Sequence, residues 1–313
     1  MQFVKILLAF LMLSVCMYAQ GKQVAVTMDD LFFAFNNTGI DRIEAASDTL
    51  LNLFTKQNIP VTVFVNEKSF IKEGETDKRL TIFNKWVNDP LITIGNHTYS
   101  HKNYAEETLP AFEDDIIQGE SISRDLLTKA GKKLKYFRFP FNCTGKDSVS
   151  RTEIFDFLNK KDYVIAPFTV ESEDYMYNAL YCDYIKKGDL KGADTIANKY
   201  IDFTMELFKY FENLSNELYG RNIKHIYLCH TNLLNTACFD KLTSRLKDEG
   251  YSFISLDEAL TDNVYQSTDY YTAKFGVSWI YRWIKNNDQR RTLLKSEPYS
   301  EDMEEQYNNL MKQ

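Results

Sequence analysis

The chain has 313 residues, of which 44% are hydrophobic and 14% aromatic, and this composition predicts a folded globular protein with one large α/β domain or two small ones. Its formal net charge of −7 at pH 7 excludes a general electrostatic attraction to nucleic acid or anionic lipid. The five cysteines include no C-x-x-C pair, which argues against a zinc ribbon and a thioredoxin-type redox centre.

Residues 1–20 have the features of a secretory signal peptide, because Lys5 precedes an apolar run over residues 6–15. The run is shorter than the roughly 20 residues that span a bilayer, so we expect an exported protein, periplasmic or extracellular, with no transmembrane span in the mature chain. Removal of Lys5 would change the formal charge from −7 to −8. A buried N-terminal strand is the less favoured interpretation. Lipid anchoring through Cys16 is a minor alternative, because Val15 stands where a lipoprotein cleavage box has a small residue.

Beyond this segment, short apolar runs alternate with longer amphipathic runs. The short runs are rich in β-branched and aromatic residues and predict strands at 23–28, 60–65, 91–95, 134–139, 163–170, 225–229 and 251–256. The amphipathic runs predict helices near 41–57, 77–88, 105–130, 149–160, 192–219 and 235–248. Strand followed by helix, repeated in this way, indicates a parallel sheet in a (β/α) barrel or an open doubly wound fold. In both folds, catalytic groups collect at the C-terminal ends of the strands.

Ionisable side chains occur at five of the predicted strand ends. They are Asp29 and Asp30 after the first strand, His97 and His101 after the third, Arg138 at the fourth, Glu171, Asp174 and Tyr175 after the fifth, and His230 at the sixth. A single histidine at a strand end is more often structural than catalytic, but three of the four histidines lie in this set. Because ionisable groups cluster at functional sites, we predict such a site on this face. His225, inside the sixth strand, is expected to serve packing.

The adjacent carboxylates of Asp29 and Asp30 need a physical reason. Neighbouring strand residues point to opposite faces, so one of the two would point into the fold, where an uncompensated charge is costly. A solvated turn or a helix cap would explain an isolated pair. Beside His97 and His101, one aspartate becomes a candidate metal ligand and its neighbour a general base for water.

Two histidines and one aspartate with an open position are a common hydrolytic zinc arrangement. His97 and His101 are four residues apart, which places both imidazoles on one face if they lie in a helical turn. Zinc is the favoured metal, and cobalt, nickel and iron accept the same ligands. A metal ion there would lower the pKa of a bound water and polarise a substrate carbonyl. Arg138 would orient the base and hold it ionised, and His230 is the natural acid for the leaving group.

Five short motifs, in this order, resemble those of the polysaccharide deacetylase family, carbohydrate esterase family 4, whose domain is also called the nodulation-factor deacetylase homology domain. The first motif of the family, usually T-F-D-D, resembles TMDD here, and the second, H-[ST]-x-x-H, resembles HTYSH. The third, R-x-P followed by an aromatic residue or glycine, resembles RFPF. The fourth, often D-x-x-D-W, resembles ESEDY, and the fifth, built on Leu-x-His, resembles LCHTN. The resemblance runs from Val24 to Leu260.

The resemblance implies an α/β protein with a single catalytic domain over residues 21–260, a distorted (β/α) barrel, followed by a C-terminal helical extension at 261–313. Carried over position by position, it implies these roles: Asp29 as general base; Asp30, His97 and His101 as ligands of a divalent metal ion; Arg138 as the residue that orients the base; Asp174 as the partner of the acid His230; and the backbone N–H of Phe141 as an oxyanion donor. Glu171 and Tyr175 would contact the substrate. The family usually has Phe, Asp and Trp where this chain has Met28, Glu171 and Tyr175, and we expect these departures to alter the pocket wall.

We therefore expect an exported, metal-dependent hydrolase that removes N-acetyl or O-acetyl groups from an acetylated glycan and releases acetate. Chitin oligomers, peptidoglycan and xylan are all candidate substrates. One alternative keeps the fold but hydrolyses a C–N bond of a small cyclic amide or imide. A second alternative is a non-catalytic glycan-binding or metal-storing protein, against which Asp29 and His230 argue because a pure binder needs neither a base nor an acid.

Cys143 and Cys182 follow the fourth and fifth predicted strands. Both would then lie in loops on the catalytic face, and an exported protein encounters an oxidising environment. A disulfide between them is therefore a further hypothesis. Its alternative is that all four cysteines of the mature chain are free buried thiols.

Overall fold

The computed structural model describes residues 21–32, 34 and 38–312. The predicted signal peptide, together with Cys16, lies outside the described residues. Within the described ranges, no helix is both long and apolar enough to cross a membrane.

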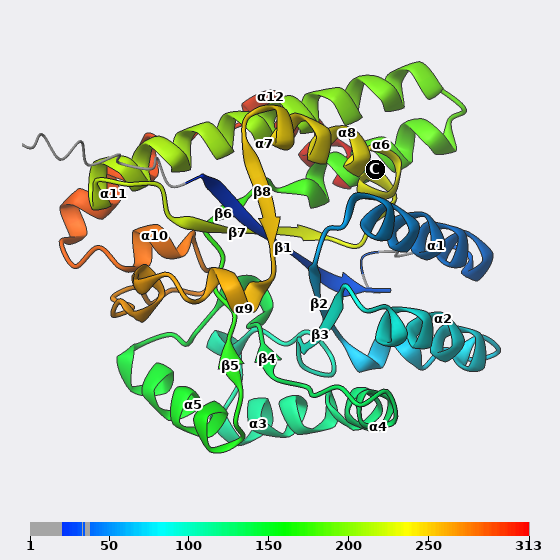
Figure 1. The fold of residues 1–313 in the computed structure, drawn as a ribbon, viewed down its shortest axis with the longest axis horizontal. Coiled ribbons are helices and arrows are strands. Elements are labelled where there is room, and N and C mark those ends of the chain that lie inside the picture. The colour runs from blue at the N-terminus through cyan, green and yellow to red at the C-terminus, as the bar shows by residue number, and fades with distance from the viewer. Residues whose placement is uncertain (1–20, 33, 35–37, 313) are drawn as a thin grey trace, which may run out of the picture.

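One parallel sheet forms the centre of the molecule (Figure 1). Its strands are β1 (Lys22–Leu31), β2 (Val61–Val65), β3 (Ile92–Asn96), β4 (Tyr136–Phe137), β5 (Val164–Ile165), β6 (Val170–Glu171), β7 (Lys224–His230) and β8 (Tyr251–Ile254). The order is β5-β4-β3-β2-β1-β7-β6, and β8 pairs with the beginning of β1. No pairing joins β5 to β6 in the described part of the chain, so the curled sheet is open there. The predicted distorted (β/α) barrel is confirmed, in the form of a half-barrel.

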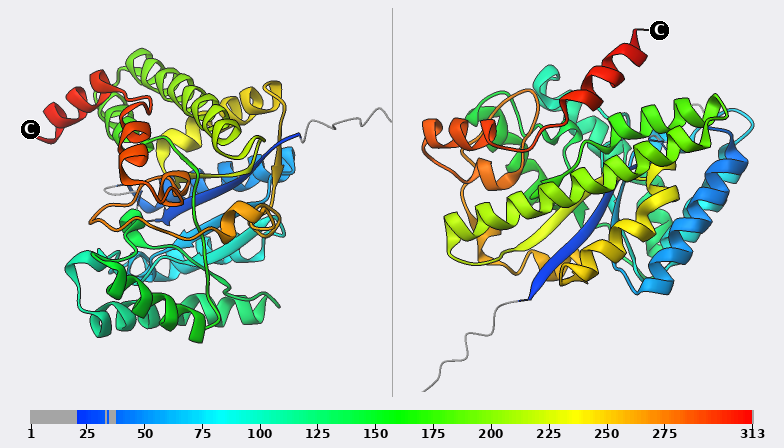
Figure 2. Two further views of the ribbon diagram at one scale, coloured as in Figure 1. Left: turned by 90° about the vertical axis from the view of Figure 1, so that its left-hand side faces the viewer. Right: turned by 90° about the horizontal axis from the view of Figure 1, so that it is seen from above.

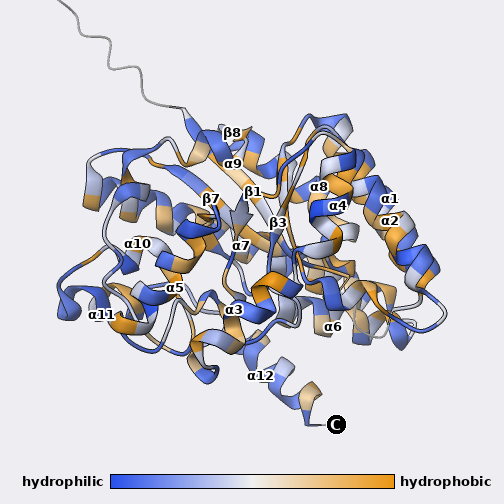
Figure 3. Cartoon of the chain, turned by 90° about the horizontal axis from the view of Figure 1, so that it is seen from below, coloured by the Kyte–Doolittle hydropathy of each residue, from blue (hydrophilic) through white to orange (hydrophobic). Residues whose placement is uncertain are grey.

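Helices surround this sheet. They are α1 (Ile40–Gln57), α2 (Thr76–Asn88), α3 (Leu109–Gln118), α4 (Ser121–Lys129), α5 (Ser148–Lys160), α6 (Asp174–Lys186), α7 (Leu190–Tyr219), α8 (Leu233–Asp248), α9 (Leu256–Ala259), α10 (Trp279–Arg282), α11 (Asn287–Lys295) and α12 (Glu301–Met311). In Figure 1, α7 crosses above the sheet, α3 to α5 lie below it, and α1 and α2 lie on the side opposite α10 and α11. The helices carry hydrophobic and hydrophilic residues side by side (Figure 3), as expected where one face packs on a sheet.

Three elements differ from the sequence prediction. The run predicted as one strand over 163–170 forms the two short strands β5 and β6, and Pro167 between them has no N–H to donate to a ladder. The helix predicted over 105–130 is divided into α3 and α4 at Gly119. Helix α6 was not predicted, because its four tyrosines and other apolar residues do not form a single stripe.

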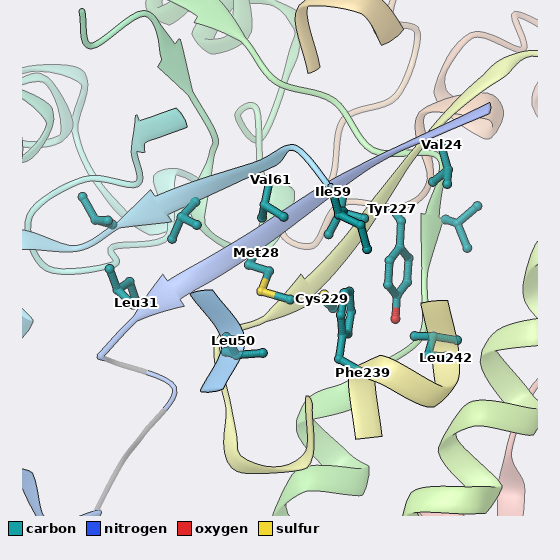
Figure 4. Packing of buried hydrophobic residues seen from close by; sticks show 14 of the residues in the cluster. Val24, Met28, Leu31, Leu50, Ile59, Val61, Tyr227, Cys229, Phe239 and Leu242 are labelled. Atoms are coloured by element: carbon teal, nitrogen blue, oxygen red, sulfur yellow. The ribbon is translucent and has the colours of Figure 1, made fainter. Parts of the chain in front are cut away.

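Alternation along β1 separates the two sides of the sheet. Met28 and its register partner Cys229 are fully buried, and they lie with Leu50 of α1 and Phe239 of α8 in the main core (Figure 4). Complete burial of a side chain of this kind contributes about 1.5–3 kcal/mol. Met28 therefore packs in the core, and its departure from the family motif does not alter a pocket wall as expected.

The side chains on the other side of β1 point toward the ionisable residues. Ala25 belongs to a second, smaller buried cluster, and the hydroxyl of Thr27 accepts a hydrogen bond from Arg138. Asp29 continues this alternation. The period of two along the strand thus places Asp29 on the inner face of the sheet.

The C-terminal residues pack on the rest of the chain. Ile280 and Tyr281 of α10 and Met303 of α12 are buried, and α12 contacts α6. Figure 2 shows the C-terminal end on the side of the molecule opposite the start of β1. The boundary at residue 260 between a catalytic domain and an extension stays a prediction.

Candidate active site

Asp29 and Asp30 at the end of β1 both approach the same histidine. Nε2 of His97 lies 3.8 Å from Oδ2 of Asp29 and 3.6 Å from Oδ1 of Asp30. Asp30 has a φ of 63°, and the register of β1 against β2 shifts between Met28 and Leu31. Irregularities of this kind re-aim side chains next to active sites. The side chains of Asp29 and Asp30 therefore lie on the same side of β1, although neighbouring side chains in a regular strand would point to opposite sides.

Asp30, His97 and His101 form the cluster that the sequence predicts. One ligand atom from each residue lies within 4.8 Å of the others, and Oδ1 of Asp30 is 3.5 Å from Nε2 of His101. The two imidazole rings are 5.0 Å apart at an angle of 70°. The segment between them is not the helical turn that the spacing suggested, because Thr98 and His101 have φ values of 67° and 59°. The histidines meet through left-handed residues instead.

Buried asparagines hold this histidine loop, and they were not predicted from the sequence. Oδ1 of Asn96 accepts a hydrogen bond from the N–H of Thr98 at 2.7 Å. Nδ2 of Asn66 donates to the carbonyl oxygen of His97 at 2.5 Å. Inside the loop, the N–H of His101 donates to Oγ1 of Thr98 at 3.0 Å. Polar groups of this buried loop are thus satisfied locally, which fixes the positions of the imidazoles.

The surroundings of His97 and Asp30 favour the protonation states that bind metal. Nδ1 of His97 donates to the carbonyl oxygen of Arg138 at 2.8 Å, and because a carbonyl only accepts, the lone pair on Nε2 faces Asp30. Burial lowers the pKa of His97, although Asp29 and Asp30 oppose this. Burial disfavours the ionised form of Asp30, but the neighbouring imidazoles outweigh burial and lower its pKa. Neutral imidazole and ionised carboxylate are the metal-binding forms.

Oδ1 of Asp30 is buried and has no hydrogen-bond partner among the described residues. A buried carboxylate oxygen without a donor is costly. Its closest nitrogens belong to His97 and His101, and the tautomer of His97 presents a lone pair rather than a proton. One carboxylate oxygen and two imidazole nitrogens are a donor set that zinc, cobalt, nickel and iron accept. The residues present therefore fit a divalent metal ion.

Arg138 is fully buried and contacts the candidate base. Its Nη1 donates to Oδ1 of Asp29 at 2.9 Å and to Oγ1 of Thr27 at 2.7 Å, and its Nη2 donates to the carbonyl oxygen of Pro167 at 3.0 Å. Burial lowers the pKa of Arg138, although the carboxylate of Asp29 opposes this. One oxygen of Asp29 is thus held by the guanidinium, while the other approaches His97.

His230 at the end of β7 is held by Asp174, the first residue of α6. Nδ1 of His230 donates to Oδ1 of Asp174 at 2.6 Å, and Oδ2 of Asp174 accepts from the side-chain amides of Asn232 and Asn235 at 2.8 and 2.7 Å. Burial favours the neutral imidazole, but the carboxylate of Asp174 outweighs burial and raises the pKa of His230 to about 10. Nε2 lies 4.0 Å from Oδ2 of Asp30, so a protonated nitrogen faces the metal cluster. The two asparagines were not predicted either, although Asn232 is part of the LCHTN motif.

Phe141 lies beside the predicted metal ligands. Its ring is 4.7 Å from the ring of His101, and the residue is 43% exposed. Phe141 and Asn142 have φ values of 54° and 51°. A bulky residue in this region costs about 1–3 kcal/mol, so it persists only where its surroundings enforce it. The predicted oxyanion donor is therefore a strained residue next to a candidate ligand.

A cleft of 910 Å³ has Asp30 and His230 in its lining. Tyr175 also lines this cleft, together with Tyr307 of α12, and the two tyrosine rings are 5.7 Å apart in an edge arrangement. Glu171 instead lines a separate cavity of 450 Å³. Burial, reinforced by neighbouring carboxylates, raises the pKa of Glu171 to about 8. The structure thus brings Tyr175, but not Glu171, to the cleft that Asp30 and His230 line.

The hypothesised disulfide between Cys143 and Cys182 is not formed, and the four described cysteines are free. Sγ of Cys143 donates to the carbonyl oxygen of Ala273 at 3.4 Å, whereas Cys182 lines the cleft.

His225 is buried within β7, and burial lowers its pKa to about 4. A neutral, buried His225 agrees with the predicted packing role.

Comparison with known families gives one match. Residues 18–157 match the family model described as polysaccharide deacetylase. Over this segment the chain is similar to the polysaccharide deacetylase family. The resemblance drawn from the sequence motifs is thereby confirmed. The match contains the first three motifs of the polysaccharide deacetylases, whereas Asp174 and His230 lie beyond it, so their assignment depends on geometry.

Solved structures show the same polysaccharide deacetylase fold. The wild-type CE4 family pseudoenzyme BA3943 from Bacillus anthracis has a TM-score of 0.50 at 16% identity, covering 78% of this chain and 66% of that chain. One BA3943 mutant, described as a pseudoenzyme, has a TM-score of 0.51 at 16% identity, with coverages of 78% and 68%. Another, described as having restored enzymatic activity, has a TM-score of 0.50 at 18% identity, with coverages of 78% and 69%. No curated protein matches the sequence.

Proposed function

We propose that the chain is an exported, metal-dependent carbohydrate deacetylase that hydrolyses N-acetyl or O-acetyl groups of a glycan and releases acetate. The observation that carries this proposal is the buried Oδ1 of Asp30, which has no hydrogen-bond partner among the described residues and faces the ring nitrogens of His97 and His101. The family match supports carbohydrate deacetylation. Export is proposed from the composition of residues 1–20.

The attack on the acetyl group needs a base near the metal cluster. Asp30, His97 and His101 would hold a divalent metal ion, which would act there as a Lewis acid that polarises the acetyl carbonyl and lowers the pKa of water. Asp29 accepts a proton from the attacking water. Oδ1 of Asp29 stays hydrogen-bonded to Arg138, which holds the carboxylate in place during the transfer.

The departing sugar nitrogen or oxygen needs a proton. His230 carries one on Nε2, because Asp174 raises its pKa to about 10, burial notwithstanding, and it donates this proton as the C–N or C–O bond breaks. The backbone N–H of Phe141 donates a hydrogen bond to the oxyanion that forms during attack. The products are acetate and a free amine or hydroxyl on the glycan.

The cleft favours a glycan over the small cyclic amide or imide. Its volume of 910 Å³ is near the upper end of the roughly 300–1,000 Å³ of pockets that bury drug-sized ligands. The rings of Tyr175 and Tyr307 give it aromatic surface against which a sugar ring can pack. BA3943 is described as a pseudoenzyme, but here Asp29 and His230 each have a charged partner within hydrogen-bond distance. These contacts support catalysis.

Acetate release tests this proposal. Protein reconstituted with zinc or cobalt is incubated with N-acetylglucosamine oligomers, peptidoglycan, acetylated xylan and succinimide, and Asp29→Asn serves as the matched control. We expect acetate from at least one glycan and none from the control. Ring opening of succinimide without acetate release would favour the C–N hydrolase, and glycan binding without any turnover would favour the non-catalytic protein.

A further inference from the structure

The loop that carries Phe141 is a tight turn, in which the N–H groups of Asn142 and Cys143 donate to the carbonyl oxygens of Phe139 and Pro140 at 3.0 and 3.1 Å. Phe141 and Asn142 are consecutive non-glycine residues with positive φ, an unfavourable combination. The backbone conformation of Phe141 decides where its N–H points. Contacts from outside the loop therefore add to the two turn hydrogen bonds in keeping both residues in the left-handed region.

A C-terminal segment, residues 273–282, contacts this loop at successive carbonyl groups. The N–H of Gly276 donates to the carbonyl oxygen of Phe141 at 2.8 Å. Nη1 of Arg282 donates to the carbonyl oxygen of Asn142 at 2.9 Å, and Nη2 donates to Oγ1 of Thr144. Two carbonyl groups in a row are thus fixed by donors from one distant segment, which restricts the rotation of the peptides on both sides of Asn142.

Arg282 is itself fixed. It is 1% exposed, it pairs with Asp269, and its guanidinium lies 4.3 Å from the ring of Trp279. A buried guanidinium with a carboxylate partner is expensive to move, because any displacement leaves a buried charge unpaired. The donor that holds Asn142 is therefore rigid.

Gly276 allows an approach that no other residue permits. A Cβ at this position would lie 2.3 Å from the carbonyl oxygen and 2.5 Å from the Cβ of Asn142. These atoms belong to the loop, so a larger residue would push the loop away. Figure 1 shows the segment that leads to α10 in orange, on the side of the sheet away from α1 and α2. It lies outside residues 18–157, the part that matches the family.

We propose that residues 273–282 position the Phe141 N–H for oxyanion binding, with Gly276 and Arg282 as the positioning residues. The proposal rests on the proposed function, because it gives the Phe141 N–H a task in acetyl hydrolysis. The C-terminal extension is then part of the catalytic apparatus, although none of its positioning contacts reaches the metal cluster.

Two variants test this, Gly276→Ala and Arg282→Lys. The first adds the colliding Cβ, and the second keeps the charge but loses the fork that holds Asn142 and Thr144 together. We expect both to retain one equivalent of zinc and the wild-type KM, and to lower kcat roughly 10- to 100-fold. Hydrogen exchange should become faster in the peptide covering residues 139–145.

Two glycine variants serve as controls. Gly21→Ala adds a Cβ with no atom within 4 Å and should match the wild type. Gly119→Ala adds a Cβ that lies 2.5 Å from the backbone of Thr98 in the histidine loop, so it should lose zinc affinity instead. An ester with a good leaving group, 4-nitrophenyl acetate, adds a second readout. Gly276→Ala should slow ester and N-acetyl hydrolysis alike, whereas His230→Ala should spare the ester, because nitrophenolate leaves without a proton.

The outcomes are distinct. Folded Gly276→Ala and Arg282→Lys proteins with wild-type exchange over residues 139–145 would overturn the inference, and so would faster exchange with an unchanged kcat. Melting temperatures identify a variant that fails to fold, and the other variant then decides. A wild type without acetate release would refute the proposed function, while the exchange measurement would still decide whether this segment holds the loop.

Discussion

The carbonyl oxygen of Arg138 accepts a hydrogen bond from Nδ1 of His97 at 2.8 Å, so the backbone of the residue that orients the base also orients a metal ligand. The side chain of Arg138 meanwhile donates to Asp29. Base and ligand are therefore aligned by one residue at the end of β4. The backbone contact is independent of the side chain, which makes the two roles separable by substitution.

Replacing Arg138 by Met should remove only the side-chain role. The buried carboxylate of Asp29 would lose its cationic partner, which typically costs about 3–5 kcal/mol. We expect the free energy of unfolding in urea to fall by that order, with turnover reduced and zinc still bound because the carbonyl of residue 138 remains. A variant that unfolds at the wild-type urea concentration would show that the pair contributes nothing to stability.

Replacing Asp29 or Asp30 by asparagine should impair the enzyme in two different ways. Asp29→Asn should keep the metal and lose about 2 to 4 orders of magnitude in turnover, the range for removal of a positioned general base. Asp30→Asn should weaken metal affinity, so that part of its loss is recovered at high zinc concentration. Zinc content and turnover are measured on both proteins. A metal-free Asp29→Asn beside a metal-replete Asp30→Asn would reverse the assignment.

Glu171 should make stability depend on pH. Its pKa is raised from 4.5 to about 8, first by burial and then by the carboxylates of Glu173 and Asp174. The folded state therefore holds a proton that the unfolded state releases, so stability is fully present below about pH 4.5 and is lost as the pH rises toward 8. The loss is about 1.4 kcal/mol for each pH unit between these two values. In Glu171→Gln, urea unfolding between pH 5 and 8 should show a smaller decline, and an identical decline would contradict the assignment.

Tyr307 should contribute to glycan binding. It reaches the cleft from α12 and contacts Tyr175 edge-on. Loss of an aromatic contact of about 0.5–1.5 kcal/mol corresponds to a KM about 2- to 10-fold higher. Tyr307→Ala should raise KM for N-acetylglucosamine oligomers and leave kcat nearly unchanged, whereas Asn308→Ala, at an exposed position of the same helix, should change neither. Equal effects of the two variants would indicate a general disturbance of α12.

The sequence predicted the strands, because β-branched runs such as 60–65 and 91–95 form a local pattern. It also predicted which strand ends carry the ionisable residues. The orientation of the Asp30 side chain was not predictable, since it depends on a positive φ within an irregular strand end. Helix α6 was missed because its apolar residues form no single stripe. Tyr307 could not be placed in the cleft, because its contact with Tyr175 joins two helices distant in the chain and no local pattern encodes it.

Acetate release by metal-free and zinc-reconstituted protein tests the central claim most directly. The purified protein is treated with a chelator, divided, and incubated with N-acetylglucosamine oligomers with and without added zinc, beside a His97→Ala variant treated in the same way. Because Asp30, His97 and His101 supply the candidate ligands, we predict no acetate from the chelated wild type, restored release with zinc, and none from His97→Ala under either condition. Equal release from the chelated and the reconstituted wild type would contradict the account.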